Sequence, residues 1–229
     1  MSKLTKAEQR KAIRTKYLEK RNRMEPEKRK AASGKIREWL FANKRYKAAG
    51  TVFVYASYKS EVETKDIIQG ALRQGKRVAA PKVHGEEMFF YEIQSWEELF
   101  PGYQGILEPQ NVGKEPLVPT SSDVMIVPGS VFDYQGGRFG YGGGYYDKYL
   151  SKIQETYGYK PYLIGLAFAC QISPKKLPVE EHDKKIDCIL TERRVIMPRE
   201  ENYGKLDVIA DVVGVAIDIG LELLADILD

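Results

Sequence analysis

The stretch "DVMIVPGSVFDYQGGRFGYGGGYYDKYL", residues Asp123–Leu150, joins a short apolar run to a glycine-rich loop and a helical pattern. Its first part, Asp123–Pro128, is rich in valine, isoleucine and methionine and ends on a proline, which predicts a buried strand. The tyrosine-rich segment after the glycines predicts a helix from about Tyr145 to Tyr157. A strand that leads through glycines into a helix N-terminus is a common place for ligands to bind in α/β proteins.

Short apolar runs alternate with helical patterns along the rest of the chain. Further strands are expected at residues 51–55, 77–81, 88–93, 162–168 and 188–191, and helices at about 5–24, 27–43 and 63–74. Thr5 and Glu8 form the capping box of the first helix, whose sparse apolar positions predict a place on the surface. The alternation predicts an α/β fold with a mostly parallel sheet that helices cover on both faces.

The composition is that of a globular protein: 229 residues, of which 43% are hydrophobic and 30% charged. The charged start of the chain has no apolar signal segment, and no uncharged apolar run reaches the roughly 18 residues of a membrane span. The two cysteines, Cys170 and Cys188, lie far apart in the sequence and form no CxxC pair, which favours a protein of a reducing compartment. We therefore expect a cytoplasmic protein with no membrane partner, either a monomer or a weak dimer.

The end of the chain differs from the rest. Residues 199–229 are expected to form a C-terminal acidic amphipathic helical extension to a single domain of residues 1–198. From Leu206 onward, Asp207, Asp211, Asp218, Glu222 and Asp229 lie on one narrow stripe, and nearly everything else there is Leu, Ile, Val or Ala. Such a broad apolar face must cover its own domain, a partner subunit or a neighbouring molecule.

The net charge of +4 conceals a basic segment, residues 1–47, with 17 Lys and Arg against 5 Asp and Glu. This charge suits an anionic partner such as nucleic acid, phosphate groups or a polycarboxylate. Few aromatic residues lie among these cations and no nucleic-acid-binding motif is present, so no nucleic-acid partner is expected. A nucleic-acid-binding protein remains the alternative, and it predicts retention on DNA or RNA that weakens steeply with salt.

The glycine loop has the residues of a phosphate site. Gly142–Gly144 can adopt conformations closed to other residues, so that successive N–H groups point at one anion. Arg138 can add a bidentate phosphate contact, and Asp147 in the first helical turn can hold Mg²⁺. The alternative is a glycine-rich surface turn with tyrosines in the core. The loop is neither a Walker A sequence nor GxGxxG, so a plain dinucleotide fold is not supported.

Other catalytic motifs are absent from the sequence. There is no GxSxG, and His84 and His182 are the only histidines, which leaves little for a hydrolase triad. No HExxH motif or Cys/His cluster supports a zinc site.

Taken together, these segments resemble the 5-formyltetrahydrofolate cyclo-ligase family, also called the 5,10-methenyltetrahydrofolate synthetases. Residues Val127–Leu150 resemble its strand, PG-x-x-F-D and R-x-G-x-G-x-G-Y-Y-D signature. "KAEQR" is similar to its N-terminal K-x-x-x-R, "SEVETKDII" (Ser60–Ile68) to its E-x-x-T stretch, and "PVEEHDKKIDCILTE" (Pro178–Glu192) to its C-terminal block. The resemblance spans residues 4–195, outside which lies the acidic tail.

The resemblance implies a three-layer α/β/α, Rossmann-like fold of the NagB/RpiA/CoA-transferase-like type. It implies the ATP- and Mg²⁺-dependent conversion of 5-formyltetrahydrofolate to 5,10-methenyltetrahydrofolate, ADP and phosphate. In this reaction the γ-phosphoryl group activates the formyl oxygen, and N10 of the same molecule closes the ring. The protein aligns the groups and neutralises charge, without a nucleophile of its own. The substrate is expected to be polyglutamylated.

The resemblance also assigns roles to residues. It gives ATP binding to Lys6, Arg10, Arg138, Phe139, Gly140, Tyr141, Gly142, Gly143, Gly144, Tyr145 and Tyr146. It gives substrate binding to Ala56, Glu61, Tyr141, Gly142, Gly143, Gly144 and Tyr145, the metal to Asp147, and catalysis to Arg138 and Tyr145. Asp133 and Asp187 are weaker candidates. Position 143 is glycine here, whereas some family members have lysine.

The candidate residues outside the loop also have explanations that involve no ligand. Without the resemblance, Lys6 and Arg10 would be interpreted as a solvated basic helix, and Glu61 as an acid that favours a helix start. A different ATP-dependent ligase or kinase on the same scaffold is the second enzyme hypothesis.

Overall fold

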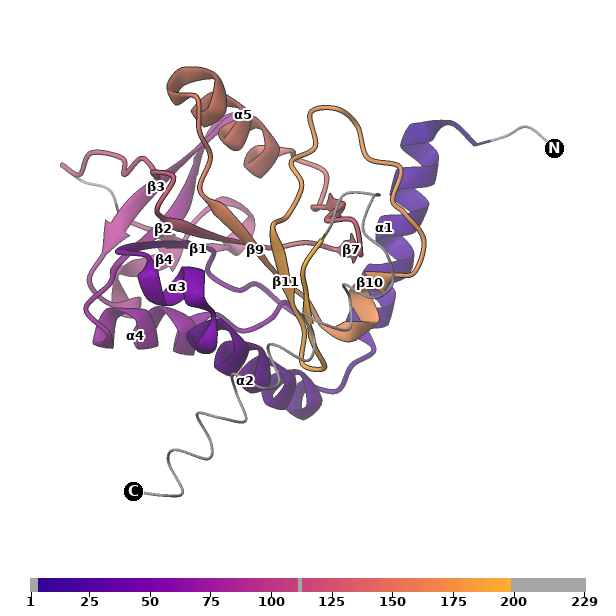
Figure 1. Cartoon of the computed structure of the whole chain (residues 1–229), viewed down its shortest axis with the longest axis horizontal. Helices are drawn as coiled ribbons and strands as arrows, with labels where there is room; N and C mark the ends of the chain where they lie inside the picture. The colour runs from indigo at the N-terminus through magenta and orange to yellow at the C-terminus, as the bar shows by residue number, and fades with distance from the viewer. Residues whose placement is uncertain (1–3, 111–112, 199–229) are drawn as a thin grey trace. The chain divides into compact units, whose positions relative to one another are not determined.

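The computed structural model describes residues 4–110 and 113–198 of the chain (Figure 1). Its centre is a seven-stranded sheet in the order β12-β11-β9-β6-β1-β2-β3. The strands are β1 (Thr51–Val54), β2 (Arg77–His84), β3 (Glu87–Ile93), β6 (Val124–Val127), β9 (Tyr162–Leu166), β11 (Cys188–Leu190) and β12 (Val195–Ile196). Pairing is parallel from β2 through β1, β6 and β9 to β11 and antiparallel at both edges, so the predicted, mostly parallel sheet is confirmed.

Helices cover both faces of this sheet (Figure 1). On one face pack α2 (Pro26–Ala42), α3 (Lys44–Ala48) and α4 (Lys65–Arg73), and on the other packs α5 (Tyr145–Tyr157). Successive residues of β1 serve the two cores, because side chains alternate across a strand. Val52 packs in the core of α2 to α4, and Phe53 in the core of α5. The predicted three-layer α/β/α arrangement is confirmed.

The first helix, α1 (Lys6–Asn22), begins at the predicted capping box. It packs against a three-stranded sheet of β7 (Val131–Asp133), β8 (Arg138–Phe139) and β10 (Ile172–Ser173). Tyr17 of α1 is buried with Val131 and Phe139, and Arg21 is buried as well. The expected surface helix is therefore anchored by one face, which holds it against the strand that leads into the glycine loop.

The remaining elements are short. They are β4 (Leu99–Pro101) paired with β5 (Leu107–Pro109), and the 3₁₀ turns η1 (Trp96–Glu98), η2 (Tyr103–Gly105) and η3 (Ala169–Gln171). The β4–β5 pair lies between the strands expected at 88–93 and 123–128, where the sequence pattern predicts no strand. In the ranges that the structure describes, no helix has the length and apolarity to cross a membrane. The amphipathic helix expected at 199–229 lies outside the described residues.

The strand order places the ends of β1 and β6 at a topological switch point. From β1 the chain steps to β2 on one side, and from β6 it steps through β9 to β11 on the other. The two connections therefore leave adjacent strands in opposite directions. In open α/β sheets, ligands bind beyond the carboxyl ends of the strands at such a switch point. The segment after β1 contains Glu61, and the segment after β6 contains the glycine loop.

Substitution of Gly165 by alanine should destabilise this sheet. Gly165 lies in β9, and a Cβ atom there would come within 2.7 Å of Cε1 of the fully buried Phe132. We expect Gly165→Ala to lower the free energy of unfolding by about 1–3 kcal/mol, measured by urea denaturation. Gly34→Ala is the control, because nothing lies within 4 Å of its added Cβ in α2. That variant should be neutral or stabilising by up to about 1 kcal/mol. An unchanged urea midpoint for Gly165→Ala would contradict the packing.

Candidate functional site

The segments after β1 and β6 meet through one hydrogen bond. The hydroxyl of Tyr141, in the glycine loop (residues 138–144), donates to Oε1 of Glu61 at 2.5 Å. Oε2 of Glu61 accepts from the amide of Tyr58 at 2.8 Å. The side chain of Glu61 is buried, four residues before α4 begins, so the interpretation of it as a helix-start acid is wrong.

The glycine loop leaves the N-terminus of α5 open. Gly144 is the N-cap at φ +68°, with no side-chain hydrogen bond to the first turn, and Gly142 has φ +114°. Both conformations favour glycine, and residues 142–144 are exposed. The first N–H groups of α5 therefore lack a capping side chain and carry the positive end of the helix dipole. This arrangement fits a phosphate group.

Arg138 and Asp147 form a shielded ion pair beside this N-terminus. Nη2 of Arg138 donates to Oδ2 of Asp147 at 2.8 Å, and Nη1 donates to the Pro128 carbonyl at 3.0 Å. Oδ1 of Asp147 accepts from the amide of Lys184 at 3.0 Å. The pair therefore ties the loop to α5 and to the segment before β11.

The surroundings of Asp147 are compatible with Mg²⁺ bound together with a nucleotide. Mg²⁺ commonly uses one or two carboxylates, with phosphate oxygens and waters as the other ligands. Each Asp147 oxygen keeps a lone pair beyond its hydrogen bond. Across residues 4–110 and 113–198, no group of three or more His, Cys, Asp or Glu side chains could hold a metal. A metal on Asp147 would thus depend on phosphate ligands.

The charge of Glu61 is under opposing influences. Burial raises the pKa of this carboxyl above its ordinary value, whereas the hydrogen bonds from Tyr141 and the Tyr58 amide, and the charge of Arg21, act to lower it. Ala56, which follows β1, is also buried. The site thus contains a carboxylate that burial penalises and that two donors stabilise.

The two basic residues of α1 lie in different environments. Arg10 is largely buried and donates to Asp183 at 2.7 and 3.1 Å and to the Pro178 carbonyl at 3.2 Å. Its guanidinium carbon lies 4.5 Å from the centre of the Phe139 ring. Lys6 is 54% exposed, with Nζ 3.8 Å from Oε1 of Glu180. Arg10 is thus not a solvated cation, whereas the Lys6 side chain is largely in solvent.

The ion pair of Arg10 also affects the pKa of Asp183. Burial alone would raise this pKa, but hydrogen bonds from Arg10 and the Glu180 amide, with the charge of Arg10, lower it overall. Asp183 is therefore ionised at neutral pH and holds α1 to the segment before β11.

The neighbouring tyrosines of α5 have different partners. The Tyr146 hydroxyl is buried and has no hydrogen-bond partner within the described part of the chain. Burial first, and then the charge of Glu61, raise the pKa of Tyr146. Tyr145 instead packs edge-on against Tyr103 and lines a hollow of about 500 Å³ along α5. The Tyr146 hydroxyl is therefore a buried polar group whose hydrogen bond is not made by the described residues.

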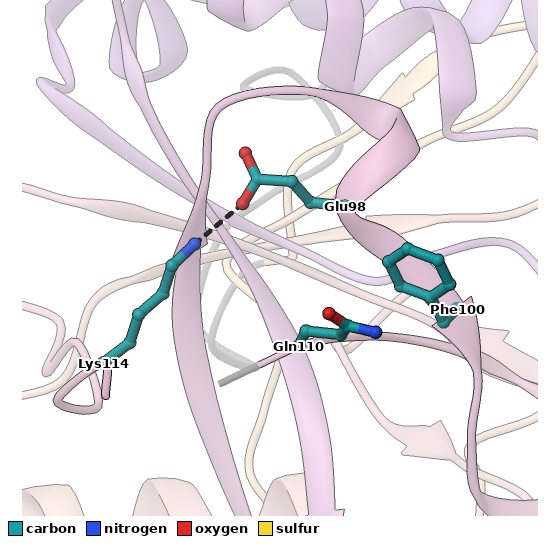
Figure 2. Close-up of a pocket in the computed structure, with 4 residues that line it drawn as sticks. All are labelled: Glu98, Phe100, Gln110 and Lys114. Atoms are coloured by element: carbon teal, nitrogen blue, oxygen red, sulfur yellow. Dashed lines mark hydrogen bonds and ion pairs between the residues drawn. The ribbon is translucent and has the colours of Figure 1, made fainter. Parts of the chain in front are cut away.

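A second hollow lies away from these residues. It has a volume of about 200 Å³ and is lined by Glu98, Phe100, Gln110 and Lys114 (Figure 2). The ammonium of Lys114 lies 2.7 Å from Oε2 of Glu98, so the charges that line it neutralise each other. No residue predicted for the site lines this hollow.

Other predicted residues have structural partners. The Phe139 side chain is in the core, and the Gly140 carbonyl accepts from Ser130 Oγ at 3.2 Å. Asp133 accepts backbone N–H groups from Gln135, Gly137 and Leu177, with the last two at 2.7 Å. Asp187 accepts from Lys160 and from the Leu163 amide.

The sequence interpretation missed Arg21. This residue lies in the last turn of α1 and donates to Tyr141 and to Ser60. Its signal was the spacing of Arg10, Tyr17 and Arg21, which places all three on one helix face.

Comparison with models of protein families shows which family this chain belongs to. The model described as the 5-formyltetrahydrofolate cyclo-ligase family matches residues 6–192, nearly all of the described fold. The chain belongs to the 5-formyltetrahydrofolate cyclo-ligase family. It is thus an enzyme of a class that acts on a folate, and the resemblance noted in the sequence is confirmed.

Individual relatives agree with this cyclo-ligase assignment. The chain is 30% identical over 205 residues to the mouse 5-formyltetrahydrofolate cyclo-ligase, covering 84% of this chain and 98% of the mouse protein. It is 35% identical over 150 residues to the protein of that name from Escherichia coli K12, covering 64% and 80%. The solved 5,10-methenyltetrahydrofolate synthetase of Aquifex aeolicus is 31% identical, with a TM-score of 0.72 over 86% of this chain and 96% of that one.

Substitution of Asp133 should separate structural from catalytic roles in this cyclo-ligase. Asp133→Asn exchanges one acceptor oxygen for a donor that would face backbone N–H groups. We expect the free energy of unfolding to fall by about 2–3 kcal/mol, measured by urea denaturation, because hydrogen bonds to charged groups contribute about this much. Turnover per folded molecule should stay near that of the parent. A large loss of turnover with unchanged stability would instead place Asp133 in the chemistry.

Proposed function

We propose that this chain converts 5-formyltetrahydrofolate to 5,10-methenyltetrahydrofolate in a reaction that consumes ATP and requires Mg²⁺. The observation that carries the proposal is the hydrogen bond between Tyr141 and Glu61, because it joins the open N-terminus of α5 to a buried carboxylate. A phosphate bound at this N-terminus and a polar heterocycle bound at Glu61 would thereby be adjacent at the switch point of the sheet. Both are needed to activate a folate with a nucleotide.

The folate would bind beside Glu61. The 2-amino-pyrimidine edge of its pterin offers paired N–H donors, and a carboxylate is the matching acceptor. Ala56 would line the same pocket. The buried Tyr146 hydroxyl, which has no partner within the described residues, would gain one if substrate binding opened this side of the pocket.

The nucleotide would bind across the glycine loop. The N–H groups of Gly142–Gly144 and of the first turn of α5 would hold its phosphates, with Arg138 at their base. Lys6 is exposed and able to reach an anion. The Arg10 guanidinium is already paired with Asp183, so a phosphate would have to share it with that carboxylate. Asp147 would hold Mg²⁺, which neutralises phosphate charge during phosphoryl transfer. Tyr145, at the same helix start, would border both ligands.

The chemistry requires alignment more than reactive side chains. The γ-phosphoryl group of ATP would turn the formyl oxygen into a leaving group, after which N10 closes the ring and phosphate departs with that oxygen. The loop and the Glu61 segment would keep formyl oxygen and phosphoryl donor in line. The Arg138 guanidinium would neutralise charge that develops on the transferred group.

Three further properties belong to this proposal. The basic segment 1–47 suits the glutamates of a polyglutamylated folate, because a polycarboxylate is attracted to concentrated positive charge. We also propose a cytoplasmic location, and a monomer or weak dimer as the active form.

The test is the absorbance band of the methenyl product. Purified protein and 5-formyltetrahydrofolate are mixed with ATP and Mg²⁺, with ATP omitted, and with Mg²⁺ removed by chelation. A rise that requires both supports the proposal. ATP bound by calorimetry without any rise would keep the phosphate site but refute the folate reaction, and would favour a different phosphoryl acceptor.

Loss of either charge in the Arg138–Asp147 pair should abolish most turnover. We expect Arg138→Ala and Asp147→Asn each to lower kcat by about 100- to 1000-fold, the range found when a group that stabilises transition-state charge is removed. The absorbance assay measures this, with circular dichroism to check the fold. The matched control is Arg77→Ala, which breaks an exposed Arg77–Glu92 pair at 2.6 Å in β2 and β3. Near-normal kcat in both site variants would refute the assignment of the loop.

A further inference from the structure

Arg21 is a buried cation whose partners all belong to the candidate site. Its side chain is 4% exposed, and it lies in the last turn of α1. Nε donates to Ser60 Oγ at 3.0 Å, and Nη1 donates to the Tyr141 hydroxyl at 2.7 Å. The guanidinium carbon also lies 5.6 Å from the centre of the Tyr141 ring. Arg21 thus contacts both the glycine loop and the residue before Glu61.

Arg21, Tyr141 and Glu61 form a chain of two hydrogen bonds, called the relay below, and the donor in each bond can be identified. A guanidinium only donates hydrogen bonds, so the Tyr141 oxygen accepts from Arg21 and its proton must point elsewhere. That proton is donated to Oε1 of Glu61, while the Tyr58 amide donates to Oε2. Both oxygens of Glu61 therefore face donors, an arrangement that only the ionised carboxylate satisfies in full. Burial raises the pKa of Glu61, and the hydrogen bonds from Tyr141 and Tyr58, with the charge of Arg21, act in the opposite direction.

The backbone before Glu61 supports the same geometry. Lys59 has φ +53°, a left-handed conformation that is unfavourable for a residue with a side chain. It lies within a turn that the Glu61 amide closes on the Tyr58 carbonyl at 3.2 Å. Ser60 Oγ, which accepts from Arg21, donates in turn to Asn22 Oδ1 at 2.5 Å. The end of α1 therefore holds the strained turn that presents Glu61.

We propose that Arg21 is a positioning residue for the pterin of the folate: it orients Tyr141 and Ser60 so that Glu61 presents an ionised carboxylate to the substrate's N–H groups. This inference rests on the proposed function, which places the pterin at Glu61. Arg21 itself need not touch the substrate. By keeping Glu61 ionised, Arg21 favours substrates whose heterocycle edge offers N–H donors. A protonated Glu61 would present a donor of its own and would no longer match that edge.

The competing explanation is that Arg21 only anchors α1 to the core. An anchor would affect stability and leave substrate affinity and its pH dependence unchanged. A positioning residue would raise KM for the folate and move the pH at which Glu61 protonates. The two explanations therefore differ in measurable quantities.

The experiment compares Arg21→Gln with Arg23→Gln in the absorbance assay. Arg23 follows α1 and is 80% exposed, so its variant should keep the parent's KM. Arg21→Gln should raise KM for 5-formyltetrahydrofolate by about 10- to 100-fold, the worth of one hydrogen bond to a charged group, with a much smaller change in kcat. Arg21→Lys restores the charge without the planar fork and should give an intermediate KM.

The pH profile provides the second readout. The groups that face Glu61 are Arg21, Tyr55, Tyr141 and Tyr146, of which Arg21 is the cation. Its charge lowers the Glu61 pKa, so Arg21→Gln should raise that pKa. Because binding requires ionised Glu61, the acid limb of kcat/KM should move to higher pH. An unmoved limb together with a KM within about twofold of the parent, in a folded Arg21→Gln protein, would overturn the proposal.

Tyr141→Phe keeps the test decisive if Arg21→Gln does not fold. The Tyr141 side chain is 51% exposed, and phenylalanine removes only the hydroxyl of the relay. KM should again rise, and an unchanged KM would overturn the proposal.

Calorimetry of 5-formyltetrahydrofolate binding without nucleotide separates failure of the proposed function from failure of the Arg21 inference. A parent protein that binds no folate refutes the proposed function and this inference together, whereas a parent that binds it as tightly as both variants do refutes this inference alone.

Discussion

Buried charge is the constraint on which the rest of this site depends. Glu61, Arg21 and Arg138 are all less than a tenth exposed, and a buried charge without partners costs several kcal/mol. The partner of both Glu61 and Arg21 is Tyr141, which lies 80 or more positions away, whereas Arg138 pairs with Asp147, nine residues further along the chain. The need to satisfy these charges therefore holds the glycine loop, the segment after β1 and the start of α5 in one arrangement.

Helix α1 contributes to this arrangement from outside the sheet. Arg10 and Arg21 lie three turns apart on one helix face, and they contact Phe139 and Tyr141, which are two residues apart at the start of the glycine loop. The basic character of this helix thus has two components. Exposed cations such as Lys6 give a field that attracts anions, whereas the buried guanidinium groups act through specific contacts. In a cyclo-ligase this combination would connect the helix to both substrates.

Much of the fold could be predicted because its signals are local. The helix expected from Tyr145 to Tyr157 has these bounds in the structure, and the Thr5–Glu8 capping box is present. Strand positions followed from apolar runs, with ends that differ by a few residues. The antiparallel edge strand β12 and the β4–β5 pair were missed. Runs of two or three residues carry no periodicity, and such strands exist only because a neighbour offers backbone hydrogen bonds.

The candidate site was predictable in its composition and less so in its contacts. The sequence by itself determined that a glycine loop precedes a helix without a capping side chain, since φ-permissive residues and helix periodicity are local properties. Its motif also determined the family. Only the tertiary structure decided that Arg10 pairs with Asp183, that Asp133 accepts from the Leu177 amide, and that Arg21 reaches Glu61 through Tyr141. Those contacts join residues separated by 40 or more positions, and the strand order and buried charge choose such partners.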